Sequence, residues 1–297
     1  MARTGRAGGS RGTLHVVGTP IGNLEDLSPR ALRAIAQARL VACEDTRVTR
    51  GLLTRHGVGA RLISCHRFSE AKRLERVLEV LREGADVALV TDGGTPAISD
   101  PGAILVRRAR EEGHRVIPVP GPSSITAIYS VSGFRATSFT FIGFLPSRKG
   151  ERRRALESLR REPRPLLFFE APHRLLGALE DAIAVLGDRR AFLAREMTKI
   201  HEEFLSGTLR SVLAAFRDRA VRGEIAFVVE GADRATAEAS ETGAPADPPG
   251  IAALRLIAEG WDRKEALRRV ARERRLSRRA VYQDLLRRGR GGREGKG

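Results

Sequence analysis

The chain has 297 residues, of which 41% are hydrophobic, and its formal net charge is +17. Its length predicts two domains with additional segments, and its hydrophobic content is sufficient for a core without disulfides or metals. The composition excludes a disulfide framework and a cysteine-rich zinc site, because the two cysteines, Cys43 and Cys65, are widely spaced. No apolar run approaches the roughly 20 residues of a membrane-spanning helix.

Residues 12–134 have the pattern of an α/β domain with a largely parallel sheet, because short apolar runs alternate with helical segments. The preceding residues 1–11 are charged without the apolar segment of a secretory signal, so we expect a disordered extension and a cytoplasmic protein with no membrane partner. The expected strands are 14–18, 40–43, 62–65, 87–91 and 116–119. The expected helices begin at Ser28-Pro29, at Ser69, at Asp100-Pro101 and at Ser123.

Residues 135–231 form a second expected α/β domain, reached through a hinge at 133–137. Its expected strands are 139–144, 166–169, 191–194, 203–206 and 225–229, and its expected helices are 152–161, 174–186 and 209–219. The short connection before residue 203 predicts antiparallel pairs among the last strands. Residues 232–250 are rich in Ala, Pro, Gly and acidic groups, which is typical of a linker.

Residues 251–297 form an expected helical appendage with 15 Lys and Arg against 6 Asp and Glu, a local charge of +9. Its expected helices are 251–258, 262–274 and 277–288, the last capped by Ser277. We expect a small core anchored by Trp261, with Leu267, Val270 and Ala271 on one helix facing Val281, Leu285 and Leu286 on the next. The arginine-rich opposite faces suit a nucleic-acid-docking module, and the alternative is a solvated charged tail.

The overall positive charge attracts polyanions, among which nucleic acid is the commonest partner. Nearly all the basic residues are arginine, however, and a GC-rich genome also favours arginine. Charge alone therefore leaves both explanations open.

Three loops at the ends of expected strands carry an unusual density of Gly, Pro, hydroxyl and carboxyl groups. They are residues 18–24, 91–102 and 118–124. In open α/β sheets, ligands bind at the carboxyl ends of the strands, where glycine lets a ligand approach the backbone and a helix N-terminus accepts an anionic group. The alternatives are a plain strand-to-helix turn for the first loop and a rigid proline turn capped by Ser123 for the third.

These loops, together with further motifs, resemble the tetrapyrrole methylase superfamily, and within it the ribosomal small-subunit methyltransferase I branch. The further motifs are Glu44-Asp45-Thr46-Arg47, Phe144-Leu145-Pro146, residues 169–175, residues 195–199, residues 201–204 and Gly223-Glu224-Ile225. The resemblance covers roughly residues 12–231, and the appendage fits the branch as well. Two departures, Gly93 where Ala is common and Met197 where Leu is common, remove no functional group.

The resemblance implies two α/β domains with a cleft for S-adenosylmethionine between them, and commonly a homodimer. The implied reaction is 2′-O-methylation of a cytidine in the decoding region of 16S ribosomal RNA, with the small ribosomal subunit as partner. The glycine pair of the second loop adds Gly94 to the implied donor-binding residues. The full set is Pro20, Asp92, Gly93, Gly94, Thr95, Ser123, Ser124, Phe169 and Met197.

A ribose hydroxyl is a weak acid, so its methylation benefits from a general base or a polarising cation. The candidates are Glu44, Asp45, Glu170, Glu196 and Lys199. The candidate RNA contacts are Arg47, Arg148, Lys149, Arg152, Arg153, Arg174 and Arg195. For each of these charged residues the alternative is a structural ion pair. We expect no metal site, because the six His residues do not cluster at ligand spacing.

Two other functions remain open at the level of the sequence. A methyltransferase acting on a tetrapyrrole would share the donor site, although the basic charge argues against it. A non-catalytic RNA-binding protein would explain the appendage but not the three polar loops. Binding of the methyl donor distinguishes the RNA-binding protein from the two methyltransferases. An acceptor assay then distinguishes the methyltransferase that acts on RNA from the one that acts on a tetrapyrrole.

Overall fold

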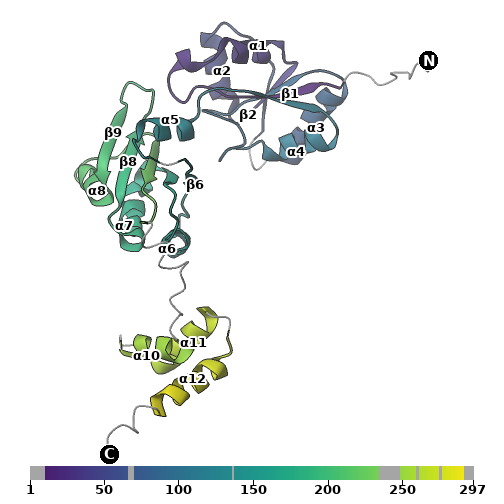
Figure 1. Ribbon diagram of the computed structural model, residues 1–297. Helices are drawn as coiled ribbons and strands as arrows, with labels where there is room; N and C mark the ends of the chain where they lie inside the picture. Colours follow the sequence, from purple (N-terminus) through teal and green to yellow (C-terminus); the bar gives the residue numbers. More distant parts are fainter. Residues whose placement is uncertain are drawn as a thin grey trace, which may run out of the picture. The chain divides into compact units, whose positions relative to one another are not determined.

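The computed structural model describes residues 11–65, 70–135, 137–233, 248–258, 261–273 and 276–290. The chain divides into two compact units, residues 1–232 and 233–297. The described residues of the first unit form two five-stranded sheets with helices, and those of the second form three helices (Figure 1). Residues 1–10 of the expected extension and residues 234–247 of the expected linker lie outside the described residues.

The first sheet is entirely parallel, as expected, in the order β3-β2-β4-β1-β5. Its strands are β1 (Thr13–Val17), β2 (Leu40–Cys43), β3 (Leu62–Ser64), β4 (Val87–Leu89) and β5 (Arg115–Val119). Its helical segments are η1 (Leu24–Asp26), α1 (Pro29–Gln37), α2 (Thr46–Arg55), α3 (Glu70–Arg82), α4 (Ala103–Glu111) and α5 (Ser124–Val131). Because the strands are parallel, the loops that follow them emerge at one edge of the sheet.

Helices cover both faces of this sheet. Ile35 of α1 and Leu53 of α2 pack with Val41 on one face, and Leu78 of α3 and Leu105 of α4 pack with other strand residues on the opposite face (Figure 1). The strands β2 and β4 are thus buried on both sides, which explains the continuous apolar run of β2.

Local details confirm one expected helix start and correct another. Ser28 caps α1, accepting a hydrogen bond from the Ala31 N–H at 3.1 Å. The helix expected to begin at Asp100-Pro101 begins instead after Gly102, whose φ of 126° is a backbone conformation that favours glycine. The helix α2 was not anticipated, although Asp45 caps it through the Arg47 N–H at 2.8 Å. Ser69, the expected cap of α3, lies outside the described residues.

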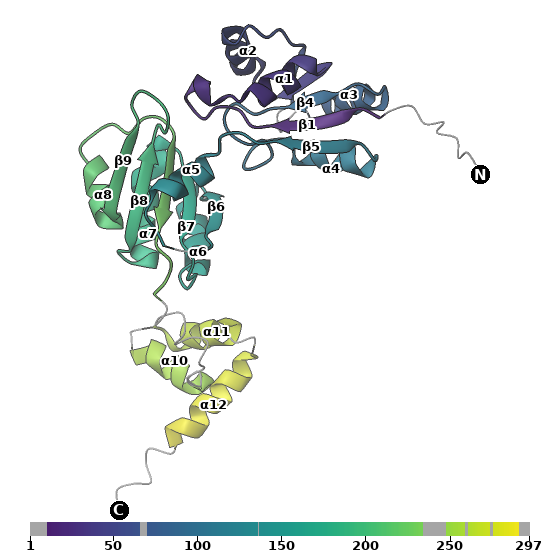
Figure 2. The same cartoon turned by 45° about the horizontal axis from the view of Figure 1, so that its top comes forward.

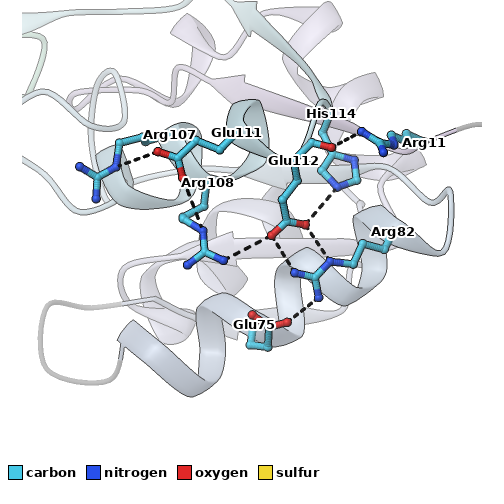
Figure 3. A network of polar contacts seen from close by, with 8 residues as sticks. All are labelled: Arg11, Glu75, Arg82, Arg107, Arg108, Glu111, Glu112 and His114. Atoms are coloured by element: carbon cyan, nitrogen blue, oxygen red, sulfur yellow. Dashed lines mark hydrogen bonds and ion pairs between the residues drawn. The ribbon is translucent and has the colours of Figure 1, made fainter.

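A network of ion pairs joins the C-terminal ends of α3 and α4 (Figure 3). These two helices lead into β4 and β5, so the network lies at the edge of the sheet opposite to the three polar loops. Its centre is Glu112, which receives two hydrogen bonds from Arg82 at 2.7 Å and one from Arg108 at 3.4 Å. The hydrogen bond from Arg82 lowers the pKa of Glu112. This network joins two helices on the same face and is structural.

The second sheet has the order β6-β7-β10-β8-β9 and confirms the expected antiparallel pairs, since only β6 and β7 are parallel among its described pairs. Its strands are β6 (Thr140–Phe144), β7 (Leu166–Glu170), β8 (Arg190–Arg195), β9 (Glu203–Thr208) and β10 (Ile225–Val229). Its helical segments are α6 (Lys149–Ser158), η2 (Pro172–Arg174), α7 (Leu175–Leu186) and α8 (Leu209–Phe216). The helix α6 begins three residues earlier than expected.

Helices α6, α7 and α8 bury one face of this sheet, and α5 lies across the other face (Figure 2). Ile128 of α5 is fully buried against Ala226 and Val228 of β10. The last helix of the first sheet thus belongs to the core of the second, which joins the two sheets.

A buried ion-pair triad connects α6 to α7. The Asp181 carboxylate accepts hydrogen bonds from Arg152 at 2.8 Å and from Arg153 at 2.7 Å, and its side chain is only 2% exposed. Burial alone would raise the pKa of Asp181, but the two guanidinium groups outweigh burial and hold the pKa below its ordinary value.

The second unit consists of α10 (Pro249–Ala258), α11 (Arg263–Glu273) and α12 (Arg278–Arg290). Its core contains Leu267, Val270, Ala271, Val281 and Leu285, as expected. Two expectations are wrong: Leu286 is 41% exposed and Trp261 is 40% exposed, so neither belongs to this core. Ser277 caps α12 through the Ala280 N–H at 3.1 Å. Among the helices that the structure describes, none combines the length and apolar character needed to cross a bilayer.

We predict that Asp181→Asn lowers the free energy of unfolding by about 3 kcal/mol, because it leaves the Arg152 guanidinium buried without a charged partner. Urea denaturation at neutral pH measures the change, with Glu157→Gln as control. That substitution removes an exposed pair with Arg160 and should cost less than about 1 kcal/mol. Because the folded-state pKa of Asp181 is lowered, its contribution is present above the unfolded value of 3.8 and is lost as the pH falls below it. Equal losses in the two variants at neutral pH would contradict this assignment.

Candidate functional site

The loops that follow β1 and β4 are paired through their backbones. The Thr19 N–H donates to the Gly94 carbonyl at 2.9 Å, and the Gly94 N–H donates to the Thr19 carbonyl at 3.0 Å. The Thr19 hydroxyl is buried and donates to the Thr91 carbonyl at 3.0 Å. Thr19 was not anticipated from the sequence, although a hydroxyl between Gly18 and Pro20 at the end of a buried strand is a usable signal.

The loop after β5 is packed on the loop after β1 through glycine. A β-carbon on Gly18 would lie 2.8 Å from the Gly121 α-carbon, and one on Gly121 would lie 2.7 Å from the Gly18 carbonyl oxygen. The Thr95 hydroxyl, in the loop after β4, lies 3.4 Å from the Pro122 carbonyl. All three polar loops therefore meet at one edge of the first sheet.

Seven of the expected donor-binding residues lie in these loops: Pro20, Asp92, Gly93, Gly94, Thr95, Ser123 and Ser124. Asp92 and Gly93 are exposed, which leaves this part of the edge open to a ligand. Gly94 has a φ of 89°, and a β-carbon on Gly93 would lie 3.3 Å from the Pro20 carbonyl. Ser123 precedes α5 and, within the described part of the chain, makes no side-chain capping hydrogen bond.

This edge fits the chemistry of S-adenosylmethionine, which carries a carboxylate, an ammonium and a polar adenosine. Glycine leaves room for close approach to the backbone at Gly93, and the uncapped first turn of α5 presents N–H groups that suit a carboxylate. The Asp92 carboxylate supplies a negative group beside them.

Three carboxylates converge at the ends of β2 and β4. The Asp45 N–H donates to Asp92 at 3.1 Å, and the Thr91 hydroxyl donates to Glu44 at 3.2 Å. Partial burial raises the pKa of Asp92, and the charges of Glu44 and Asp45 add to this effect. Hydrogen bonds from Arg47 lower the pKa of Asp45 to about 2, so Asp45 is ionised and committed to Arg47 and to the cap of α2.

A turn of the second sheet lies against the first of these loops. The Asn23 N–H donates to the Thr198 hydroxyl at 3.0 Å, and a β-carbon on Gly22 would lie 2.5 Å from the Lys199 side chain. Glu196 and Thr198 adopt left-handed conformations, with φ of 53° and 66°. The sequence motifs had indicated Glu196, Met197 and Lys199 in this turn, but not the contact between Asn23 and Thr198.

Lys199 is held between two carboxylates. Its Nζ lies 2.9 Å from Glu196 and 3.3 Å from Glu224, and Glu196 also accepts the Glu224 N–H at 2.8 Å. Burial alone would lower the pKa of Lys199, but the hydrogen bond to Glu196 and the charge of Glu224 outweigh it and raise the pKa. Lys199 is therefore a fixed cation rather than a base.

The strand β7 presents its two candidate residues differently. Phe169 lies on the face covered by α5, in one cluster with Met197, and contacts Phe144 at a ring distance of 5.7 Å. Glu170 is 2% exposed and pairs with Arg174 at 3.1 Å. Burial raises the pKa of Glu170, and the charge of Arg174 opposes this shift. The structure thus pairs the buried Glu170 with the half-buried Arg174.

The remaining candidate RNA contacts differ in exposure. Arg148 and Lys149 are exposed at the start of α6, whereas Arg152 is 8% exposed and, like Arg153, is held by Asp181. Arg195 donates to Glu203 at 2.8 Å.

Comparison with known proteins places the chain in a family. The model of the "Tetrapyrrole (Corrin/Porphyrin) Methylases" matches residues 13–213. A Halalkalibacterium halodurans protein named ribosomal RNA small subunit methyltransferase I is 41% identical, over 92% of this chain and 94% of that protein. A protein of the same name from Thermotoga maritima is 46% identical over 74% of this chain and 99% of its own length.

Solved structures support the fold. A cobalt precorrin-4 methyltransferase matches with a TM-score of 0.56 at 20% identity, covering 73% of this chain and 94% of that one. A uroporphyrin-III C-methyltransferase from Thermus thermophilus, solved with S-adenosylhomocysteine, matches with a TM-score of 0.54 at 19% identity, covering 74% of this chain and 98% of that one. The chain therefore belongs to the tetrapyrrole methylases and, within them, to the family of ribosomal RNA small subunit methyltransferase I.

Proposed function

We propose that this chain transfers the methyl group of S-adenosylmethionine to the 2′-hydroxyl of a cytidine in 16S ribosomal RNA. The observation that carries this proposal is the identity of 41% over nearly the full lengths of this chain and of a relative named for ribosomal RNA methylation. That match covers 92% of the chain, which is more than the 232 residues of the first unit. It therefore extends into the basic appendage.

The donor site is proposed at the edge where the three polar loops meet. S-adenosylmethionine, when bound, supplies a methyl group that its sulfonium already activates. The N–H groups in the first turn of α5 would hold a carboxylate, Asp92 would hold a cationic or hydroxyl group, and the Gly93-Gly94 backbone would approach the ligand closely. Phe169 and Met197 would contact it from the second sheet. The main task of these residues is to align the reacting atoms.

For the acceptor hydroxyl we propose Glu44 as general base and Lys199 as the cation that stabilises the developing alkoxide. Asp45 is committed to Arg47, Glu170 to Arg174, and Glu196 to Lys199. Glu44 accepts a hydrogen bond from the Thr91 hydroxyl and lies beside Asp92 of the donor loop. A base must lie within reach of the hydroxyl that it deprotonates, and Glu44 is the carboxylate of this group with the fewest described partners.

We also propose the small ribosomal subunit as substrate and a homodimer, both of which follow from the resemblance to the family, and a cytoplasmic location, as expected from the sequence. We omit Arg152 from the proposed RNA contacts, because it is buried with Asp181, and we retain Arg148 and Lys149, which are exposed.

Mapping of 2′-O-methyl groups in 16S ribosomal RNA tests the proposal directly. RNA from a strain that lacks this protein should lose one cytidine methyl group, and the purified chain with S-adenosylmethionine should restore it on isolated small subunits. An unchanged methylation map would contradict the proposal, and methylation of a tetrapyrrole instead would favour the other branch of the superfamily.

We predict that Asp92→Ala and Gly94→Val each weaken donor binding by more than about 1.4 kcal/mol, a tenfold change in Kd. Valine at Gly94 would strain a backbone with a φ of 89° and disturb the pairing with Thr19. Isothermal titration with S-adenosylmethionine measures the effect. Gly51→Ala is the control, because a β-carbon there has no neighbour within 4 Å among the described residues. Affinities near that of the wild type in both folded variants would remove this loop from the site.

We predict that Arg148→Ser with Lys149→Ser reduces the slope of log Kobs for RNA against log salt by about 1 to 2, because each lost phosphate contact removes roughly one unit or less. Filter binding across a salt series measures the slope. Arg107→Ser with Arg110→Ser on α4 removes equal charge and should change the slope less. A slope that is identical in the two double variants would show that the start of α6 does not contact RNA.

A further inference from the structure

Two aromatic side chains lie at the surface of the second unit, although its core consists of Ala, Leu, Ile and Val. Trp261, which precedes α11, and Tyr282 of α12 are each 40% exposed. Large aromatic side chains usually dominate the core of so small a unit. Their exposure is therefore not explained by folding.

Each ring lies against an arginine of α11. The Arg269 guanidinium carbon is 4.8 Å from the centre of the Trp261 ring, and that of Arg263 is 5.5 Å from the centre of the Tyr282 ring. Such cation–π contacts hold a ring in place while part of its surface stays accessible. Both rings are thus positioned by the same helix.

Two further exposed arginines lie one helical turn before Tyr282. Arg278 and Arg279 are exposed and lie four and three residues before Tyr282, so all three share one side of α12. Residues 251–297 carry 15 Lys and Arg against 6 Asp and Glu. Accessible aromatic rings among arginines are the combination that binds single-stranded nucleic acid, since bases stack on the rings and guanidinium groups contact phosphates.

We propose that Trp261 and Tyr282 form a stacking site for unpaired bases of ribosomal RNA, with Arg263, Arg278 and Arg279 contacting the adjacent phosphates. The identity of the RNA rests on the proposed function, whereas the site itself rests on the rings and charges described above. The Thermotoga maritima relative is matched over 99% of its length by 74% of this chain. The first unit is thus long enough for a complete family member, which makes the second unit an addition to it.

The only tryptophan of the chain is Trp261, so its intrinsic fluorescence reports on this site in the unmodified full-length protein. Titration with a single-stranded oligoribonucleotide from the small-subunit RNA should quench the emission. An abasic ribose-phosphate oligomer of equal length and charge should bind more weakly and leave the emission nearly unchanged. Equal quenching by the two oligomers, or no quenching by either, would overturn the proposal.

Substitutions separate stacking from structure. Trp261→Ala and Tyr282→Ala should each raise the Kd of the full chain for the oligoribonucleotide roughly tenfold, whereas Trp261→Phe and Tyr282→Phe should retain most of the affinity. The matched control is Leu286→Ala, because Leu286 is a similarly exposed apolar residue of α12. An equal loss in this control, an equal loss in the phenylalanine variants, or no loss in the alanine variants would overturn the stacking site.

Methyl incorporation into small subunits, measured in parallel, distinguishes the two proposals. The alanine variants should keep the wild-type rate at saturating subunit concentration and lose rate only at limiting concentration. A wild-type chain that methylates without fluorescence quenching would overturn the stacking site alone. A chain that shows quenching with the oligoribonucleotide but methylates no ribosomal RNA would contradict the proposed function alone.

Discussion

The close approach of the Gly18 and Gly121 backbones is the constraint on which the candidate site depends. The strand pairing between β1 and β5 continues one residue beyond β1, because the Gly18 N–H donates to the Val119 carbonyl at 3.0 Å. After β5 the chain crosses the end of β1 at Gly121 and enters α5. Ile128 of α5 is buried against the second sheet. A side chain at either glycine would separate the two loops, so this contact determines both the shape of the donor edge and the path by which the second sheet is reached.

Around this contact the site is built mostly from backbone, and part of that backbone is strained. The non-glycine residues with positive φ in the described part of the chain are Ala97, Ser99, Glu196 and Thr198, all in loops of the candidate site. Such conformations cost of order 1 kcal/mol each and persist only where neighbouring contacts enforce them. Thr198 is bonded to Asn23, and Glu196 to Lys199, so the strained turn is held in place by the loop that it faces. This arrangement fixes the turn that carries Glu196, Met197 and Lys199 against the loop after β1.

Local patterns predicted the sheet elements well, and β2 and β10 match the expected strands to the residue. The polar loops were also recognised, because glycine and proline after buried strands are local signals. Partners distant in sequence were not predictable. Arg152 follows a run of basic residues that suggested RNA, yet it is bound to Asp181, 29 residues further along the chain. Trp261 was expected in the appendage core, whereas the aliphatic residues of that core pack without it. The sequence shows which interactions a side chain can make, but it does not show which distant residue lies beside that side chain in the folded protein.

The distribution of charge also depends on which partners the basic side chains have in the folded protein. Six of the seven arginine and lysine candidates for RNA contact lie within 4.0 Å of a carboxylate of the chain, so most of their charge is compensated inside the first unit. Residues 251–297, by contrast, contribute +9 of the total of +17. Long-range attraction of a polyanion depends on uncompensated charge, and the density of that charge per residue is higher in residues 251–297 than in the rest of the chain. Two units on one chain that bind the same RNA raise each other's effective concentration at the substrate. On the two proposals made above, the first unit would supply the aligned chemistry, and the second would add attraction for the RNA.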